Sequence, residues 1–331
     1  MKLNFCTLFD SAFLPYGLTM YRSIKNNCLD FNLYIFPFDE ACAQLLTKLE
    51  LENVTIISLK EFENPSLLGI KNNRSKKEYL WTCASSTILY CLDKLQLDHC
   101  TYLDADIFFF NDPSPLFSEF NSGSVLLTEH RYTPKFDVSS ESGKYCIQYI
   151  TFRNDKDGLA SLKWWVNSCF EWCYDRYEDG KFGDQKYLDD WLMRFNNIIV
   201  TNHPGGGVAP WNVQQYRFST AGNILRGFDK KTRKMFNLIF YHFHEFRQLN
   251  QKQLFFGGYP LGRNVIDLIY RPYINSFQQS LKMIKSIDPD YSQFFGMLPK
   301  TNWKKNHMKL YRKIVTGNYN VVSLQKFLEK N

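Results

Sequence analysis

The sequence predicts an α/β protein built around a largely parallel sheet. Strand and helix patterns alternate along the first hundred residues, which is the order expected when helices connect parallel strands. The strands are short apolar runs, and the chain has 44% hydrophobic residues in a length of 331, enough for one large packed core. Aromatic residues reach 17%, and their rings fill a core or stack on bases and sugar rings.

Each element of the first half follows from a local pattern. Strands are predicted where apolar or β-branched residues run together, at residues 2–9, 31–36, 54–57 and 101–103. Helices are predicted where apolar residues recur at helical spacing, at residues 16–25, 40–50 and 78–95. This order is typical of nucleotide-binding sheets, which bind their ligands at the carboxyl ends of the strands.

The second half is less regular. Strands are predicted at residues 125–127, 145–152, 198–200 and 238–241, and helices at 156–177 and from about Asp184. Beyond about Arg263 the pattern is helical. We therefore expect a catalytic domain at 1–262 and a helical, basic C-terminal extension at 263–331.

The charge of the chain is uneven. Residues 296–331 contain eight of the 40 basic residues and one of the 33 acidic residues, so the rest of the chain carries 32 of each. The basic amphipathic stretch 302–315 suits the surface of an anionic membrane, or equally a solvated helix packed on the domain. No nucleic-acid partner is expected, since the rest of the chain is neutral and contains no binding motif.

The cysteines and the N-terminus predict a cytoplasmic protein. The nine cysteines include no Cys-x-x-Cys pair and are expected to be reduced thiols in the core. The chain has no run of about 18 apolar residues and opens on a strand pattern instead of a signal peptide. Contact with the inner face of a membrane would be peripheral.

Two carboxylates stand in an apolar segment at the end of the strand 101–103. Asp104 and Asp106 are costly there unless they meet a cation or hydrogen-bond donors. Alternate residues of an extended segment point the same way, so both carboxylates can reach one point. Hard oxygen ligands suit Mn²⁺ or Mg²⁺ on a diphosphate. The alternative is a turn with two capping aspartates.

At these residues the sequence resembles the GT-A glycosyltransferases, especially the branch near glycogenin and the bacterial lipopolysaccharide galactosyltransferases. The resemblance covers roughly residues 1–260, and the order of the matching blocks carries it. The blocks are Phe5–Asp10, Glu78–Thr82, Tyr102–Asp106 followed by Asp112-Pro113, Gly183–Leu188, Val208–Asn212 and Tyr241–His244.

The resemblance implies a mixed sheet flanked by helices and a UDP-sugar donor, with retention of anomeric configuration. It implies Mn²⁺ or Mg²⁺ bound by Asp104, Asp106 and His242, with His244 as second choice for the histidine. Asp184 and Gln185 would be catalytic residues near the donor sugar, although an Asp at that position also suits a helix cap. The other expected contacts to the nucleotide sugar are Thr7, Asp10, Thr82, Asp104, Gln148 and Arg247.

Two departures from the family leave the donor open. The Gly-x-Lys-Pro-Trp that follows the metal histidine in the family is missing, so we expect the diphosphate to be held by Arg247 or by a lysine that the sequence does not identify. Ile147-Gln148-Tyr149 stands where members often carry Asn-x-Gly, and the Gln148 amide suits a sugar hydroxyl. The glycine-containing segment 203–207 is expected to be a flexible loop that closes over the donor.

The expected activity is hexosyl transfer to a carbohydrate or glycolipid acceptor. The resemblance to the family suggests a bacterial surface polysaccharide as this acceptor. A nucleotidyltransferase would carry a glycine-rich loop after its first strand, where this chain has Asp10-Ser11-Ala12-Phe13. A phosphatase of the Asp-x-Asp-x-Thr type would carry Thr or Val at the position of Phe108. A non-catalytic protein that binds sugar nucleotides is the alternative from another class.

Overall fold

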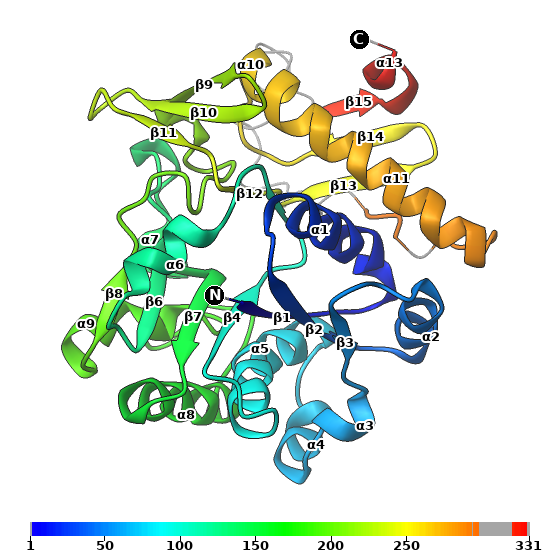
Figure 1. The fold of residues 1–331 in the computed structure, drawn as a ribbon. Coiled ribbons are helices and arrows are strands. Elements are labelled where there is room, and N and C mark those ends of the chain that lie inside the picture. The colour runs from blue at the N-terminus through cyan, green and yellow to red at the C-terminus, as the bar shows by residue number, and fades with distance from the viewer. Residues whose placement is uncertain (1, 293, 298–319, 330–331) are drawn as a thin grey trace.

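A seven-stranded sheet forms the centre of the computed structural model, which describes residues 2–292, 294–297 and 320–329 (Figure 1). The strand order is β3-β2-β1-β4-β7-β6-β8. β1, β2, β3 and β4 are parallel, β6 and β8 are parallel to each other, and β7 runs antiparallel to both β4 and β6. The predicted mixed α/β sheet is confirmed.

The strands of this sheet agree closely with the predicted ones. They are β1 (Leu3–Phe9), β2 (Phe31–Pro37), β3 (Val54–Ile56), β4 (His99–Leu103), β6 (Val125–Glu129), β7 (Tyr145–Arg153) and β8 (Ile198–Val200). The helices of the same region are α1 (Leu14–Asn27), α2 (Glu40–Leu49), α3 (Leu59–Phe62), α4 (Pro65–Lys71), α5 (Lys76–Asp93), α6 (Ser114–Phe120), α7 (Ser139–Ser142), α8 (Lys156–Glu171) and α9 (Trp191–Arg194). Short 3₁₀ turns are η1 (Ser11–Phe13), η2 (Pro134–Phe136), η3 (Lys186–Asp190) and η4 (Val213–Gln215).

Helices cover both faces of the sheet. α1 packs with α11 (Arg271–Ile287) on one face, and α5 packs with α8 on the other (Figure 1). The side chains of β1 alternate between the two layers: Phe5 and Phe9 join the core beside α1, whereas Cys6 and Leu8 join the core beside α5. β1 is therefore buried on both faces, as a central parallel strand should be.

The helix that precedes β4 is fixed by its first turn. Ser75 and Glu78 form a capping box in which the side chain of each residue accepts from the backbone amide of the other, satisfying amides that the helix leaves free. Tyr79, Ile88 and Cys91 then face the sheet. α5 thus returns the chain to β4 in the parallel direction.

Three smaller sheets complete the fold. β5 (Ile107–Phe109) pairs with β12 (Phe240–His242), β9 (Tyr216–Ala221) and β11 (Met235–Asn237) flank β10 (Ile224–Asp229), and β13 (Phe246–Asn250) and β15 (Val321–Ser323) flank β14 (Gln253–Phe256). The helices predicted beyond residue 262 are present as α10 (Arg263–Val265), the π-helical turn η5 (Ile266–Tyr270), α11 and α13 (Leu324–Leu328). β15 is an unpredicted strand in this region, and one hydrophobic cluster joins side chains from both sides of residue 262.

Two helix predictions need correction. The helix predicted at 156–177 ends at Glu171, since Trp172 is extended and residues 172–177 continue outside the helix. The helix predicted from Asp184 begins only at Lys186, as the 3₁₀ turn η3, and continues as the short helix α9. The amphipathic stretch 302–315 lies outside the described residues. None of the described helices is long and apolar enough to cross a membrane.

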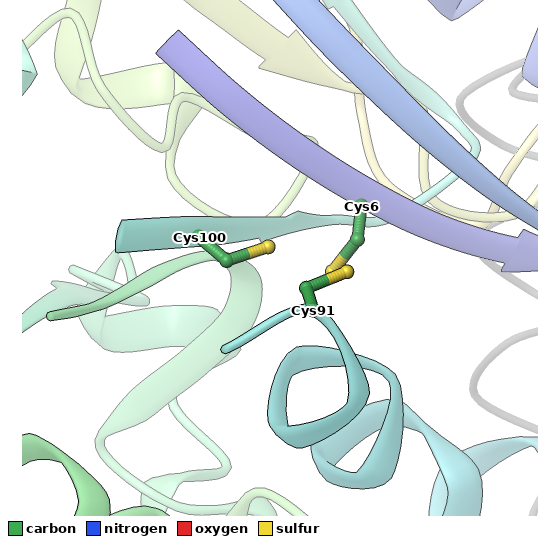
Figure 2. A group of neighbouring side chains, drawn as sticks. All are labelled: Cys6, Cys91 and Cys100. Carbon is green, nitrogen blue, oxygen red and sulfur yellow. The ribbon is translucent and has the colours of Figure 1, made fainter. Parts of the chain in front are cut away.

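The nine cysteines are free and buried, as predicted for core thiols. Cys6 of β1, Cys91 of α5 and Cys100 of β4 bring their sulfur atoms within 4.8 Å of one another between the sheet and α5 (Figure 2). This three-cysteine cluster is enclosed in the core, with each residue fully buried.

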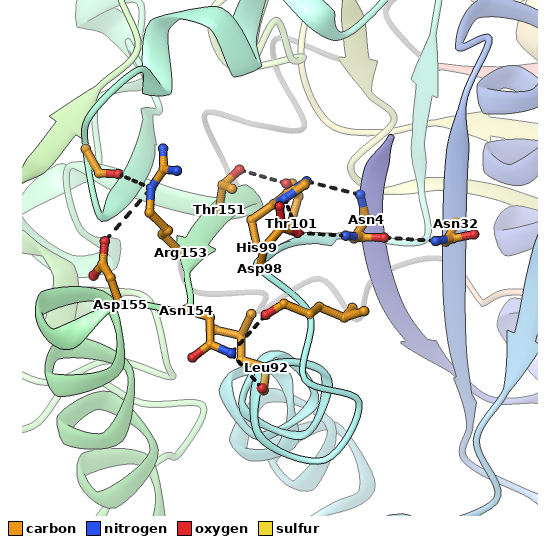
Figure 3. Close-up of polar contacts among 12 residues, drawn as sticks. Asn4, Asn32, Leu92, Asp98, His99, Thr101, Thr151, Arg153, Asn154 and Asp155 are labelled. Atoms are coloured by element: carbon orange, nitrogen blue, oxygen red, sulfur yellow. Dashed lines mark hydrogen bonds and ion pairs between the residues drawn. The ribbon is translucent and has the colours of Figure 1, made fainter. Parts of the chain in front are cut away.

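A polar network ties the strands together at their end opposite to Asp104 (Figure 3). The side-chain amide of Asn4 donates to Asp98 and accepts from Asn32. The backbone N–H of Asn4 donates to His99 Nε2 at 3.3 Å. These bonds satisfy polar groups at the sheet edge, so we assign them a structural role.

Candidate active site

Asp104 and Asp106 lie at the carboxyl end of β4, in the turn that leads into β5. The Ile107 amide donates to the Asp104 carbonyl at 3.3 Å, which closes this turn. The expectation of an extended segment with alternating side chains is therefore wrong. Both carboxylates nonetheless reach the same histidine, because the turn and the β5–β12 pairing bring them there.

His242 is placed by the pairing of β12 with β5, in which it stands opposite Ile107. Its Nε2 lies 3.0 Å from Asp106 Oδ1 and 3.9 Å from Asp104 Oδ2. The imidazole is 7% exposed, and the Asp104 and Asp106 side chains are 24% and 14% exposed. The structure therefore brings together the three residues predicted as metal ligands, and all three side chains are largely buried.

Gln148 of β7 holds the other side of the His242 ring. Gln148 Oε1 lies 2.7 Å from His242 Nδ1, and because a carbonyl oxygen only accepts, Nδ1 carries the proton. The Gln148 carbonyl also accepts from the Asp104 amide at 3.1 Å. Gln148 is fully buried, so the geometry makes it a residue that orients His242, in place of the predicted contact to a sugar hydroxyl.

Burial and mutual charge separate the acidities of the two carboxyl groups. Burial, together with the charge of Asp106, raises the pKa of Asp104 to about 6. Burial acts in the same direction on Asp106, but the charge and hydrogen bond of His242 outweigh it and lower the pKa of Asp106 to about 2. Asp106 and His242 consequently form a strong ion pair, and the pKa of His242 is raised well above its usual range by these carboxylates against the effect of burial.

These residues fit a divalent cation. Two carboxylates and an imidazole offer two hard oxygen ligands and one borderline nitrogen, a donor set suited to Mn²⁺. The hydrogen bond from Nδ1 to Gln148 directs Nε2 toward the carboxylates, so a cation that displaced the Nε2 proton would meet the nitrogen lone pair there, as at metal-binding histidines.

Cys146 is a site residue that the sequence analysis missed. Its sulfur lies with ligand atoms of Asp104 and His242, all within 4.8 Å of one another. Cys146 and Gln148 are two residues apart on β7 and therefore share a face. That spacing from Gln148 was the available signal in the sequence.

His244 is placed differently from His242. β12 ends at His242, and His244 lies in the following turn with an exposed side chain. Both rings contact the edge or face of Trp211, with centroids 5.4 Å away in each case. Trp211 is 4% exposed and donates from Nε1 to the His130 carbonyl at 2.9 Å, so it anchors the wall beside both histidines.

Asp184 is buried close enough to Asp104 for their charges to interact, while the Gln185 side chain bonds to another part of the chain. Asp184 is 3% exposed, and burial with the charge of Asp104 raises its pKa to about 8. Asp184 Oδ2 has no hydrogen-bond partner among the described residues. Gln185 Nε2 donates to the Ser142 carbonyl at 2.9 Å. Asp184 does not cap η3, whose first residue is preceded by Gln185.

Of the other predicted contacts, one lies near Asp106 and the rest lie in the core or in the turn after β1. Arg247 of β13 is half-buried, and its charge contributes to the low pKa of Asp106. Asp10 caps η1 through a bond from the Phe13 amide and pairs with Lys76 at 2.6 Å. Thr7 and Thr82 are fully buried, so their hydroxyl groups are not exposed to a ligand in this structure.

The segment 203–207 is part of the interior, so the expectation of a loop free to close over the donor is wrong. Gly205, Gly206 and Gly207 are buried, and the Gly205 carbonyl accepts from the Ile239 amide at 3.0 Å. A side chain at Gly207 would be strained by its φ of +90° and would stand 3.0 Å from Gln148 Nε2. This segment therefore packs against Gln148, the residue that orients His242.

Comparisons with known proteins agree with this architecture. No family model matches the chain. It is 29% identical over 303 residues to the uncharacterized protein YfnD of Bacillus subtilis (strain 168), covering 90% of this chain and 95% of that protein. It is also 29% identical over 305 residues to YfnF of the same strain, covering 89% and 98%.

Among solved structures, the chain is similar to the galactosyltransferase LgtC in complex with donor and acceptor sugar analogs. The TM-score is 0.51 at 11% sequence identity, and the likeness covers 92% of this chain and 99% of that chain. The chain is also similar to the glycosyltransferase GlyE of Streptococcus pneumoniae TIGR4, at a TM-score of 0.41 and 16% identity, over 61% of this chain and 45% of that chain. The LgtC likeness shows the fold: this chain has the GT-A fold that the sequence predicted.

Proposed function

We propose that this chain is a metal-dependent glycosyltransferase that moves a hexosyl group from a UDP-sugar to an acceptor hydroxyl. The observation that carries the proposal is the convergence of Asp104, Asp106 and His242 at the carboxyl end of β4 within a GT-A fold. This is the end of a parallel strand at which α/β sheets bind their ligands. The similarity to LgtC, a galactosyltransferase by name, supports the class of reaction.

The chemistry requires charge stabilisation at the leaving group. A divalent cation, Mn²⁺ or Mg²⁺, would neutralise the negative charge that develops on the diphosphate as the glycosidic bond breaks. Asp104, Asp106 and His242 would hold this cation, and the imidazole nitrogen favours Mn²⁺ over Mg²⁺. Arg247, on the same side as Asp106, would bind a phosphate oxygen of the leaving diphosphate.

Asp184 would bind the donor sugar. With a pKa of about 8, its carboxyl group is protonated near neutral pH and can donate a hydrogen bond to a sugar hydroxyl as well as accept one. A protonated acid is a poor nucleophile, and so is the Gln185 amide, which is bonded to Ser142. For the retention of configuration that we propose, this favours attack of the acceptor on the face that the diphosphate leaves over a covalent glycosyl-enzyme intermediate.

The acceptor proposed is a carbohydrate or glycolipid of a bacterial surface polysaccharide. The LgtC complex with sugar analogs of both substrates supports a carbohydrate acceptor. The basic composition of residues 296–331 supports peripheral contact with an anionic membrane, where a lipid-linked acceptor would be found. Sedimentation with anionic and neutral lipid vesicles tests this contact, and equal binding to both would contradict it.

A thermal-shift panel tests the proposed donor. The melting temperature is measured with UDP, GDP, CDP and dTDP, each with and without Mn²⁺, because a ligand that binds only the folded state raises it. We expect a rise with UDP that requires Mn²⁺ and is absent in D106N. A metal-independent rise, or none with any nucleotide, would contradict the proposed site. Tight UDP-sugar binding without turnover would favour a sugar-nucleotide sensor.

A further inference from the structure

We propose that Cys146 is a fourth protein ligand of the metal site and that its thiolate makes this site select cobalt- or zinc-like cations over Mg²⁺. The inference deepens the proposed function, since it concerns the same cation. It starts from the three ligand atoms of Asp104, Cys146 and His242 that lie within 4.8 Å of one another.

The spacing of these atoms is close to that of a coordination sphere. Metal–ligand bonds of ~2.0–2.3 Å place neighbouring ligand atoms roughly 3.0 Å apart in six-coordinate and roughly 3.5 Å apart in four-coordinate geometry. His242 Nε2 is already 3.0 Å from Asp106 and 3.9 Å from Asp104. The ligand atoms of Asp104, Cys146 and His242 lie within 4.8 Å of one another, so small side-chain movements would bring the sulfur to the same cation.

The direction of Cys146 is set by the sheet. It lies on β7, two residues before Gln148, and both side chains approach His242 from the same face. The backbone of Cys146 is fixed, because Thr128 Oγ1 donates to its carbonyl at 3.1 Å. Cys146 is 4% exposed and packs beside Ala209 and Trp211, so water does not compete for the sulfur.

Four protein ligands leave room for a diphosphate. With six ligands around the cation, Asp104, Asp106, His242 and Cys146 would supply four and would leave two for oxygens of the donor diphosphate. Thiolate sulfur is a soft ligand that favours Co²⁺ and Zn²⁺ and contributes little to Mg²⁺. Cys146 would thus set the metal preference of this chain apart from that of a site with oxygen and nitrogen ligands alone.

Cobalt spectroscopy of the full chain tests this assignment. Sulfur bonded to Co²⁺ gives a near-ultraviolet charge-transfer band, whereas oxygen and nitrogen ligands give only the weaker visible bands. We expect the charge-transfer band in the wild type and its loss in C146S, with visible bands retained. We also expect Co²⁺ affinity to fall about tenfold or more in C146S while Mg²⁺ affinity is unchanged.

The three-cysteine cluster of Cys6, Cys91 and Cys100 is a second source of sulfur, so C91S is the matched control. The charge-transfer band should survive in C91S. A band that disappears in C91S and survives in C146S would overturn the proposal, and so would visible Co²⁺ bands that depend on Asp106 without any sulfur band. In the latter case the proposed function would stand, whereas a complete absence of Co²⁺ binding would contradict both. C146A, with its melting temperature measured, distinguishes loss of the ligand from loss of the fold.

Discussion

His242 is held between Gln148 and Asp106, with Nδ1 2.7 Å from Gln148 Oε1 and Nε2 3.0 Å from Asp106 Oδ1. One ring nitrogen is thereby fixed as a donor, and the other is directed at the carboxylates. The first prediction follows from this relationship. Q148L leaves the Nδ1 proton buried without an acceptor and frees the ring to rotate, so we expect Mn²⁺ affinity to fall about tenfold to a hundredfold.

Calorimetric titration of Mn²⁺ into Q148L checks this value. Q44L is the control, because Gln44 is an exposed residue of α2 whose side chain donates a hydrogen bond to Glu40. Mn²⁺ affinity equal to that of the wild type in both variants would show that Gln148 does not orient the ligand.

The two histidines should differ in their effect on the metal. H242A removes a ligand and leaves Asp104 and Asp106 as an uncompensated pair, so we expect Mn²⁺ affinity to fall about a hundredfold or more. H244A removes an exposed ring beside Trp211, and its effect should stay within about threefold. Mn²⁺ electron paramagnetic resonance measures both, and the reverse order would assign the ligand to His244.

The raised pKa of Asp184 predicts that the free energy of unfolding depends on pH. Its pKa of about 8 in the folded chain is above the ~3.9 of an unfolded aspartate, so folding favours the protonated form. The associated stability is fully present below about pH 4 and is lost as the pH rises toward 8. The amide side chain introduced in D184N cannot ionise, so the variant is not destabilised as the pH rises. Its free energy of unfolding relative to the wild type should therefore increase from pH 5 to pH 8.

Urea unfolding at several pH values in EDTA measures this difference. At about 1.4 kcal/mol per pKa unit, the relative gain of D184N should reach at least about 2 kcal/mol across this range. D93N, at an exposed position, should follow the wild type at every pH. A constant difference between D184N and the wild type would show that Asp184 titrates normally.

The Arg247 side chain should contribute to binding of the diphosphate and not to binding of the uridine. A charge-assisted hydrogen bond contributes ~1.5–3 kcal/mol, so R247A should weaken UDP binding about tenfold to a hundredfold and leave uridine binding unchanged. R226A, which removes an exposed arginine of β10, is the control. Equal losses for UDP and uridine would indicate that R247A disturbs the pocket as a whole.

The sheet could be predicted from the sequence because its signals are local. Residues 2–9 and 78–95 show their strand and helix periods within a single window, and the capping box at Ser75 and Glu78 marks a helix start. Asp104 and Asp106 were visible because carboxylates in an apolar run are costly without a partner.

The partners within the site could not be predicted, because long-range pairing sets them. The Gln148–His242 bond joins residues 94 apart in the sequence, and Cys146 reaches the site only because β7 lies antiparallel to β4. The burial of residues 203–207 was hidden for the same reason: glycines suggest a mobile loop, whereas here they allow close packing against Gln148 and the Asn237 carbonyl.

UDP release from UDP-hexoses tests the central claim most directly. The chain is incubated with each UDP-hexose in Mn²⁺ or EDTA, and UDP is measured for the wild type, D106N and D93N. We predict metal-dependent release from at least one donor by the wild type and D93N, and release at least about a hundredfold slower by D106N. Release that survives EDTA and D106N would contradict the account.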